Sequence, residues 1–183
     1  GRDALHYLLD PFSDHKVGFV TGRTKYVAPE GHILGQSTTI YSKLESLLKD
    51  LESRLGFCLG ADGAIFAIRK ELFRPLNSWD INDLVIPLNI IEQGYVGIQD
   101  NRAVCREESV KDKEREFNRQ VRITNRTLRA IFNNKHLLNP FRYPLFSFCL
   151  FSHKLMKFGL PFFLIVLLIS NVFLLGQGPF YVM

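Results

Sequence analysis

The sequence predicts an α/β domain followed by helices that associate with a membrane. Three observations support this prediction: helical and strand-like patterns alternate through much of the chain, basic residues gather in its middle part, and a charge-free apolar run lies near its end. With 183 residues, 46% of them apolar, the chain can bury a substantial core, which excludes a disordered chain.

The N-terminal part begins with a short helix and a strand. Leu5, Leu8 and Leu9 have the spacing of one helical face, and Pro11 is expected to end that helix. Residues 16–27 then alternate in the manner of a half-buried strand.

The next elements continue the alternation of helix and strand. Residues 37–55 carry apolar side chains at helical spacing, and Gly56 is expected to terminate this helix. Residues 60–73 pass from a small-residue turn through a strand-like run into a helix-forming segment, and residues 95–100 indicate another strand. A long helix is predicted over residues 106–133, and the whole pattern favours an α/β core.

The stretch DINDLVIPL sets acidic residues immediately before an apolar run. Pro87 is tolerated only near the start of a helix, so the helix should begin close to Asp83, and Gly94 should cap its end. An Asp in this place has two explanations. It stabilises the helix N-terminus, or it is a general base that Leu84 and Val85 partly shield from water.

Charge is distributed unevenly along the chain. Residues 102–142 contain eleven Lys or Arg and five Asp or Glu, net +6, whereas residues 1–101 contain ten and thirteen, net −3. A basic segment of this kind attracts either anionic lipid or a phosphorylated substrate, and composition does not decide between them.

Four arginines of the predicted long helix recur at three- and four-residue steps and so share one side. They are Arg119, Arg122, Arg126 and Arg129, and Val110, Phe117, Val121 and Leu128 lie along another side. The acidic residues of the helix precede these arginines, which favours phosphate binding over a solvated, ion-paired face. Nucleic acid is not expected as a partner, because aromatic residues are not interleaved with the arginines.

The C-terminal part is predicted to meet a membrane. The eighteen uncharged residues 159–176 are long enough for one transmembrane helix, with a buried core helix as the alternative. The apolar residues 141–151 are too few to cross a bilayer and suit a helix in its interface. Lys154 and Lys157 precede the span, so the upstream part is predicted to be cytoplasmic.

The cysteines and histidines indicate no metal site. Cys58, Cys105 and Cys149 lack the spacing of zinc or redox motifs, so reduced thiols are expected. His136 and His153 are interpreted as polar residues of the membrane interface.

Four motifs together resemble one protein family. The stretches GADGAIFAIRKELF, INDLVIPL, EFNRQVRITN and LFSHKLMKFGLPFFLI occur in an order similar to that of membrane-integrated family 2 glycosyltransferases, the processive class that includes hyaluronan, chitin and cellulose synthases. The resemblance covers nearly the whole chain. It implies a GT-A fold and transfer of a sugar from a UDP-sugar, with inversion, to the hydroxyl of a growing glycan.

The resemblance also implies roles for individual residues. Asp83 corresponds to the catalytic base, and Asn82, expected to bind the acceptor, stands where the family usually has a first acid. Arg122 matches an arginine that approaches the donor diphosphate, and Arg119, expected to bind the diphosphate as well, stands where the family has a glutamine. Asp62, with Gly63, corresponds to the acceptor loop, although a turn aspartate is an equal alternative.

The chain is expected to contain only part of a GT-A domain, because it resembles the C-terminal part of such an enzyme. Residues 1–135 would form that part of the GT-A domain, residues 136–157 an interfacial helix region, residues 158–176 a transmembrane helix and residues 177–183 a tail. The full-length enzyme would be a multi-pass protein of the cell membrane with a cytoplasmic catalytic part. It would need Mg²⁺ or Mn²⁺, whose ligands would precede this segment, and the segment alone should be inactive.

A second hypothesis belongs to another class of protein. The chain could be a non-catalytic membrane-anchored protein whose basic helix binds anionic lipid. The enzyme hypothesis requires a UDP-sugar donor, a glycan acceptor and a lipid bilayer as partners, whereas the second requires only the bilayer.

Overall fold

The computed structural model describes residues 3–27, 40–108 and 113–174, and the chain divides into two compact units, Gly1–Leu137 and Leu138–Met183. The first unit combines helices with a small sheet, so the predicted α/β class is confirmed. Its assignment to the GT-A fold stays a prediction.

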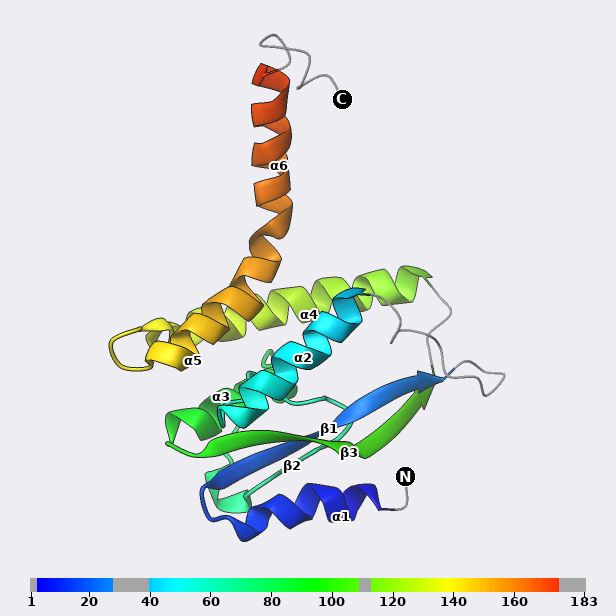
Figure 1. Ribbon diagram of the computed structural model, residues 1–183, viewed down its shortest axis with the longest axis vertical. Helices are drawn as coiled ribbons and strands as arrows, with labels where there is room; N and C mark the ends of the chain where they lie inside the picture. The colour runs from blue at the N-terminus through cyan, green and yellow to red at the C-terminus, as the bar shows by residue number, and fades with distance from the viewer. Residues whose placement is uncertain (1–2, 28–39, 109–112, 175–183) are drawn as a thin grey trace. The chain divides into compact units, whose positions relative to one another are not determined.

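The sheet has three strands within the described residues, in the order β2-β1-β3 (Figure 1). The central strand β1 (Val17–Val27) pairs antiparallel with β2 (Phe66–Ile68) and parallel with β3 (Val96–Glu108). Because successive side chains of a strand point to opposite faces, Phe19 and Val20 belong to two different core clusters.

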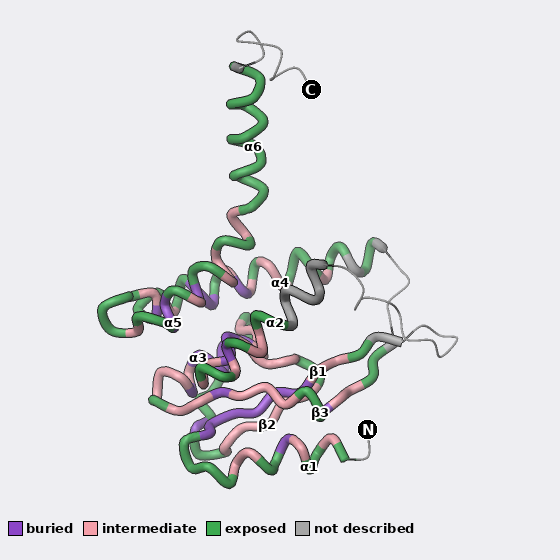
Figure 2. Tube along the Cα trace, viewed as in Figure 1, coloured by how far each residue is buried: buried purple, intermediate pink, exposed green. Residues whose placement is uncertain are grey.

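Helices cover both faces of this sheet. On one face, Leu8 of α1 (Ala4–Leu9) packs with Val20. On the other face, Ile90 of α3 (Asn82–Glu92) packs with Phe19. Figure 2 shows that buried residues gather along β1 and α3, which places the centre of the core between the sheet and the helix that carries Asp83.

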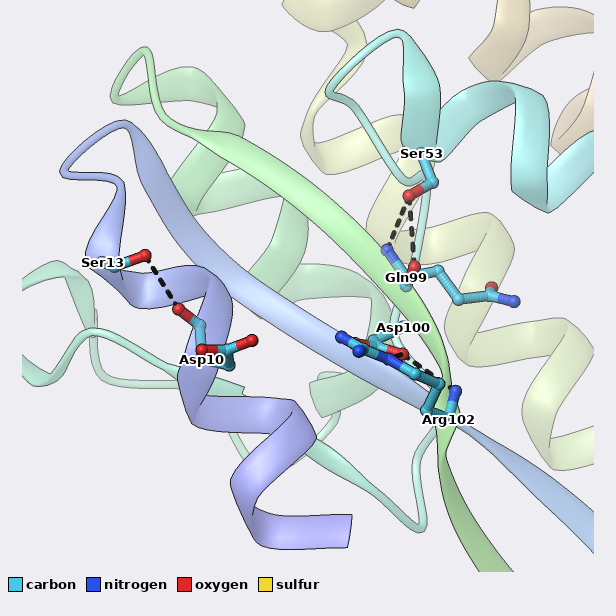
Figure 3. Close-up of polar contacts among 6 residues, drawn as sticks. All are labelled: Asp10, Ser13, Ser53, Gln99, Asp100 and Arg102. Carbon is cyan, nitrogen blue, oxygen red and sulfur yellow. Dashed lines mark hydrogen bonds and ion pairs between the residues drawn. The ribbon is translucent and has the colours of Figure 1, made fainter. Parts of the chain in front are cut away.

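The helix α2 (Ile40–Arg54) is tied to β3 by polar contacts near its end. The backbone N–H of Gln99 donates to Ser53 Oγ at 2.8 Å, and the Ser53 hydroxyl donates to the Gln99 carbonyl at 3.4 Å (Figure 3). Gly56 follows with φ +80°, in the left-handed conformation that a helix stop requires. The predicted helix and its termination are therefore confirmed over the described residues.

The first helix, α1, ends at Leu9, just before Pro11 as expected, and the chain continues as a 3₁₀ turn, Asp10–Ser13, that accommodates a proline near its start. Two other local expectations are wrong. The predicted helical segment before residue 73 is only the 3₁₀ turn Lys70–Leu72. The strand expected to end at residue 100 continues to Glu108, since its second half pairs with Arg23–Val27 of β1.

The long helix α4 (Lys113–Asn133) begins later than predicted, and a different side of it is buried. Its buried side chains are Thr127, Ala130 and Ile131. Phe117 and Val121, from the apolar side of the sequence pattern, are 67% and 44% exposed. Val110, from the same predicted stripe, lies outside the described residues.

The second unit contains one long helical run. The helix α5 (Pro144–Cys149) continues through a π-helical stretch, Leu150–Leu155, into α6 (Met156–Leu174). Over Pro144–Phe173 this run is long and apolar enough to span a membrane, and it is the single such helix in the part of the chain that is described. The expected interfacial segment and the expected span thus belong to one run, and residues 175–176 of that span lie outside the description.

Candidate active site

Asp83 lies in the first turn of α3, which confirms its predicted place at a helix N-terminus. The N-cap residue is Ile81, which offers no side-chain hydrogen bond, and the Asn82 side chain accepts a hydrogen bond from the Asp83 backbone N–H at 2.9 Å. Asn82 therefore satisfies a first-turn N–H group, and the Asp83 carboxylate is not the N-cap. Its negative charge is still favoured by the helix dipole at this end.

Pro87 explains how a neighbouring loop is held against Asp83. It is fully buried inside α3, beyond the first turn where it was expected. Proline has no N–H to donate to the carbonyl of the residue four positions earlier, which here is Asp83. That carbonyl instead accepts a hydrogen bond of 2.7 Å from the backbone N–H of Ala61.

The predicted acceptor loop thus lies directly beside the predicted base. A Cβ atom added to Gly63 would approach Asp83 Oδ2 to 3.2 Å, so the glycine makes room for the carboxylate. The loop closes as a tight turn in which the Ile65 N–H donates to the Asp62 carbonyl at 3.0 Å. Two motifs that are about twenty residues apart in sequence are therefore in contact.

Asp62 fixes this loop to the sheet. Its Oδ2 accepts from the Thr24 backbone N–H and its Oδ1 from the Thr24 hydroxyl, each at 2.7 Å. Oδ1 also accepts from the Ala64 N–H at 3.2 Å, and the Asp62 N–H donates to Thr21 Oγ1 at 2.6 Å. These contacts fit a turn aspartate. A carboxylate offers about four acceptor positions, so the three bonds leave room for a substrate hydroxyl.

The surroundings of Asp83 change from apolar to open within a few residues. Leu84 and Val85 are buried at 4% and 7% exposure, Asp83 is half-buried, and Asn82 and Gly63 are exposed. The carboxylate therefore lies at the boundary between the core and the surface. This is where a base must lie to meet a substrate while part of its hydration shell is removed.

Arg119 and Arg122 lie on α4, a helix that packs against α3. Arg119 is half-buried and Arg122 is exposed. The described contacts join Asp62, Gly63, Asn82 and Asp83 into one group, while the two arginines come from a separate element. Any approach of the arginines to Asp83 depends on the packing of these two helices.

The far end of α3 is attached to the chain beyond α4 by a charged group. Glu92 Oε2 is 2.6 Å from Arg74 Nη1, and Glu92 Oε1 is 2.8 Å from His136 Nε2. Both helices therefore end on the same side of the unit, as Figure 1 also shows. Along α3, Asp83 lies about 14 Å before Glu92 at the helix end. Along α4, Arg122 lies about 16 Å before Asn133 at the helix end. Asp83 and Arg122 are therefore at comparable distances from the side of the unit on which both helices end.

Sequence reasoning missed the residues that support the site. Thr21 and Thr24 hold Asp62 from β1, and no local pattern marks them, because their partner is more than 35 residues away. Pro87 was noticed only as a helix-start signal. Its spacing of four residues from Asp83 was the available sign that the Asp83 carbonyl would have no partner within the helix.

The residues present do not make a metal site by themselves. Within the described ranges, no three His, Cys, Asp or Glu side chains are grouped so that they could hold an ion. The divalent cation implied by the family resemblance would need ligands from elsewhere.

Comparison with known proteins adds no assignment. No protein-family model matches the chain, and no curated protein matches it. The site is therefore defined by its own geometry: a half-buried carboxylate in the first turn of a helix, a loop bound to that residue's backbone, and a row of arginines on an adjacent helix.

Proposed function

We propose that the chain is part of the catalytic domain of a membrane-bound, inverting glycosyltransferase that transfers a sugar from a UDP-sugar to a growing glycan. The observation that carries the proposal is the contact between the GADG loop and Asp83 through the Ala61 N–H and the Gly63 surface. A base and an acceptor-binding loop must be adjacent for the acceptor hydroxyl to lose its proton during attack.

In this proposal, Asp83 is the general base. The oxygen of the acceptor hydroxyl attacks the anomeric carbon of the donor, and its proton passes to the Asp83 carboxylate. The bond between the anomeric carbon and the diphosphate oxygen breaks, and UDP leaves with the electron pair. Asn82, whose side-chain oxygen binds the Asp83 N–H, helps to fix the position of the base.

Arg119 and Arg122 are proposed to bind the diphosphate of the donor. Guanidinium groups bind phosphate oxygens through paired, charge-assisted hydrogen bonds, and they stabilise the charge that develops on the leaving group. Arg122 is exposed and therefore accessible to a ligand. Its distance from the shared end of α3 and α4 is comparable with that of Asp83, which supports a common site for donor and acceptor.

The bilayer is proposed as the third partner. The helical run Pro144–Phe173 follows the α/β unit and is apolar over a membrane-spanning length. We place the α/β unit on the cytoplasmic side because Lys154 and Lys157 lie at the start of the most apolar part. The full-length protein would cross the membrane more than once, in an arrangement suited to a glycan that leaves the cell.

The test is Asp83→Asn in the full-length protein, with donor binding and sugar transfer measured separately. Removing a general base should lower the transfer rate by about 10²- to 10⁴-fold and leave UDP affinity unchanged. Asp10→Asn is the matched control, since Asp10 is an exposed acid in the first turn of another short helix. Normal turnover of Asp83→Asn would remove the proposed role.

One observation favours the second candidate, a non-catalytic protein that binds anionic lipid. Phe117 and Phe132 of α4 are 67% and 62% exposed, and the arginines of the same helix lie on another side of it. An apolar side next to a basic side is typical of helices that lie on a membrane. Binding to vesicles that depends on their charge, together with no affinity for UDP, would support this candidate over the enzyme.

A further inference from the structure

We propose that Trp79 is a binding platform for a sugar ring of the acceptor, placed beside the base Asp83. This inference rests on the proposed function and assigns a residue to its acceptor side. Trp79 lies in the short turn that leads into α3, and Asp83 lies in the first turn of that helix, four residues later.

The turn that carries Trp79 is held by hydrogen bonds at both of its ends. Asp80 Oδ2 accepts from the Asn77 backbone N–H at 2.8 Å and from the Asn77 side chain at 3.2 Å. The Asp80 N–H in return donates to the Asn77 carbonyl at 3.0 Å. Such reciprocal bonds limit the conformations of the two residues between them, Ser78 and Trp79.

The turn is also anchored on each side along the chain. Leu72 is buried in the core cluster with Phe19 and Ile90, and Leu76 packs against that cluster. After the turn, the Ile81 carbonyl accepts from Leu84 and Val85 in the first turn of α3. A side chain on this turn is therefore presented from a fixed backbone, which lowers the ordering cost of binding.

Trp79 is 46% exposed in this anchored position. An exposed apolar side chain alone needs no explanation, but Trp79 precedes Asp83 by only four residues. Asn82 and Gly63, which lie next to Asp83, are exposed as well. Four residues span at most about 14 Å, a distance that a short glycan segment can bridge. One ring can therefore stack at Trp79 while the terminal hydroxyl reaches Asp83.

The chemistry of the indole suits this role. Pyranose rings present apolar C–H groups on their faces and hydroxyl groups at their edges. A flat aromatic face packs against the former while water or polar side chains bind the latter, and the indole N–H remains available as a donor. Indole is the largest aromatic surface among the side chains, and this chain contains a single Trp. The occupant that we infer is thus an oligosaccharide of pyranose sugars.

The single tryptophan makes a direct binding experiment possible. The full chain in detergent micelles is titrated with cello-, chito- and hyaluronan oligosaccharides while indole emission is recorded, and Trp79→Phe supplies the background. A saturable change in emission with at least one of these probes is expected. No change with any of them would overturn the inference.

Acceptor kinetics in the full-length protein give an independent test. Trp79→Ala should raise the acceptor KM by about tenfold, with the donor KM unchanged, and Trp79→Phe should recover most of the loss because an aromatic face is retained. Phe73→Ala is the matched control, since Phe73 is 49% exposed on the same segment but more distant from Asp83 in sequence. An acceptor KM that is equal in Trp79→Ala and the unaltered protein would contradict the inference.

The two proposals can fail separately. If Trp79 emission responds to an oligosaccharide but no sugar is transferred from UDP-sugars, the site binds glycans and the transferase proposal is wrong. If transfer proceeds and is unaffected by Trp79→Ala, the transferase proposal stands and the platform lies elsewhere.

Discussion

The backbone N–H of Ala61 donates a hydrogen bond of 2.7 Å to the carbonyl oxygen of Asp83. This bond joins a loop to the first turn of a helix, and it exists because Pro87 cannot supply the helical donor that would otherwise occupy the carbonyl. The helix thus gives up one internal hydrogen bond at the position where the proposed base is carried.

Pro87→Ala should weaken the attachment of this loop. The alanine N–H competes for the Asp83 carbonyl, so the amide of Ala61 should exchange with solvent about two- to tenfold faster, as expected for a bond worth about 0.5–1.5 kcal/mol. Hydrogen exchange measured on peptides that cover residues 59–64 would show this. Pro75→Ala, at an exposed proline outside the helix, should leave the exchange unaltered. Equal exchange in both variants would mean that Pro87 does not govern the contact.

Gly63→Ala should displace the Asp83 carboxylate without unfolding the protein. The new Cβ would meet Asp83 Oδ2 at 3.2 Å, and a side-chain oxygen can move by the few tenths of an ångström that are needed. We expect a change in the free energy of unfolding below about 1 kcal/mol and a transfer rate lowered about three- to tenfold. Ala64→Ser, at the exposed neighbour, is the control. A normal transfer rate for Gly63→Ala would argue against any functional contact between loop and acid.

Arg122→Ala should weaken donor binding. Loss of a charge-assisted pair costs about 1.5–3 kcal/mol, so the Kd for UDP should rise by about 10- to 150-fold, and the rate should fall with it. Arg129→Ala is the matched control for Arg122→Ala, because both arginines are exposed and lie on the same side of α4. Calorimetric titration with UDP separates the two variants. Equal effects would indicate a general influence of the basic helix on the ligand.

Acid should destabilise the first unit partly through Asp100. The Arg102 side chain, 2.7 Å away, lowers the pKa of the Asp100 carboxyl below its usual value by hydrogen bonding and charge. A carboxyl whose pKa is lowered by folding contributes stability above the unfolded-state pKa, about 3.9, and loses it as the pH falls through the lower folded-state pKa. Urea unfolding between about pH 5 and 2 should therefore show a shallower acid dependence in Asp100→Asn. An identical pH profile would mean that the pair contributes nothing measurable, as is common for exposed arginines.

Much of the fold could be predicted where the signal is local. The alternation of residues 16–27 and the stop at Gly56 depend on neighbouring residues only, and the structure confirms both. The second half of β3 was missed because its charged residues resemble a helix start, whereas its conformation depends on pairing with β1. The buried side of α4 does not follow from its apolar pattern either. Thr127 and Ala130 are buried although they are less apolar than Phe117, which is exposed.

The candidate site was predictable in part. Gly94 follows the end of the helix that carries Asp83, and Pro87 lies inside it, deeper than the first turn where it was expected. The place of Asp83 near a helix start still followed from sequence, because a proline this close to the start limits how far the helix extends before it. Its contact with the loop did not, because the hydrogen bonds from Thr24 to Asp62 and from Ala61 to Asp83 join residues that are distant along the chain. Such contacts depend on the packed fold and leave no periodic mark.

The exposed leucines of α2 have a consequence for handling the protein. Leu47, Leu51 and Leu55 recur at four-residue steps and are about half exposed, so they form an apolar strip on the outside of the first unit. In aqueous buffer such strips adhere to one another, and a preparation without detergent is expected to form soluble oligomers or precipitate as its concentration rises. Leu47→Lys and Leu51→Lys should remove the part of this self-association that comes from α2 while leaving the core unaltered.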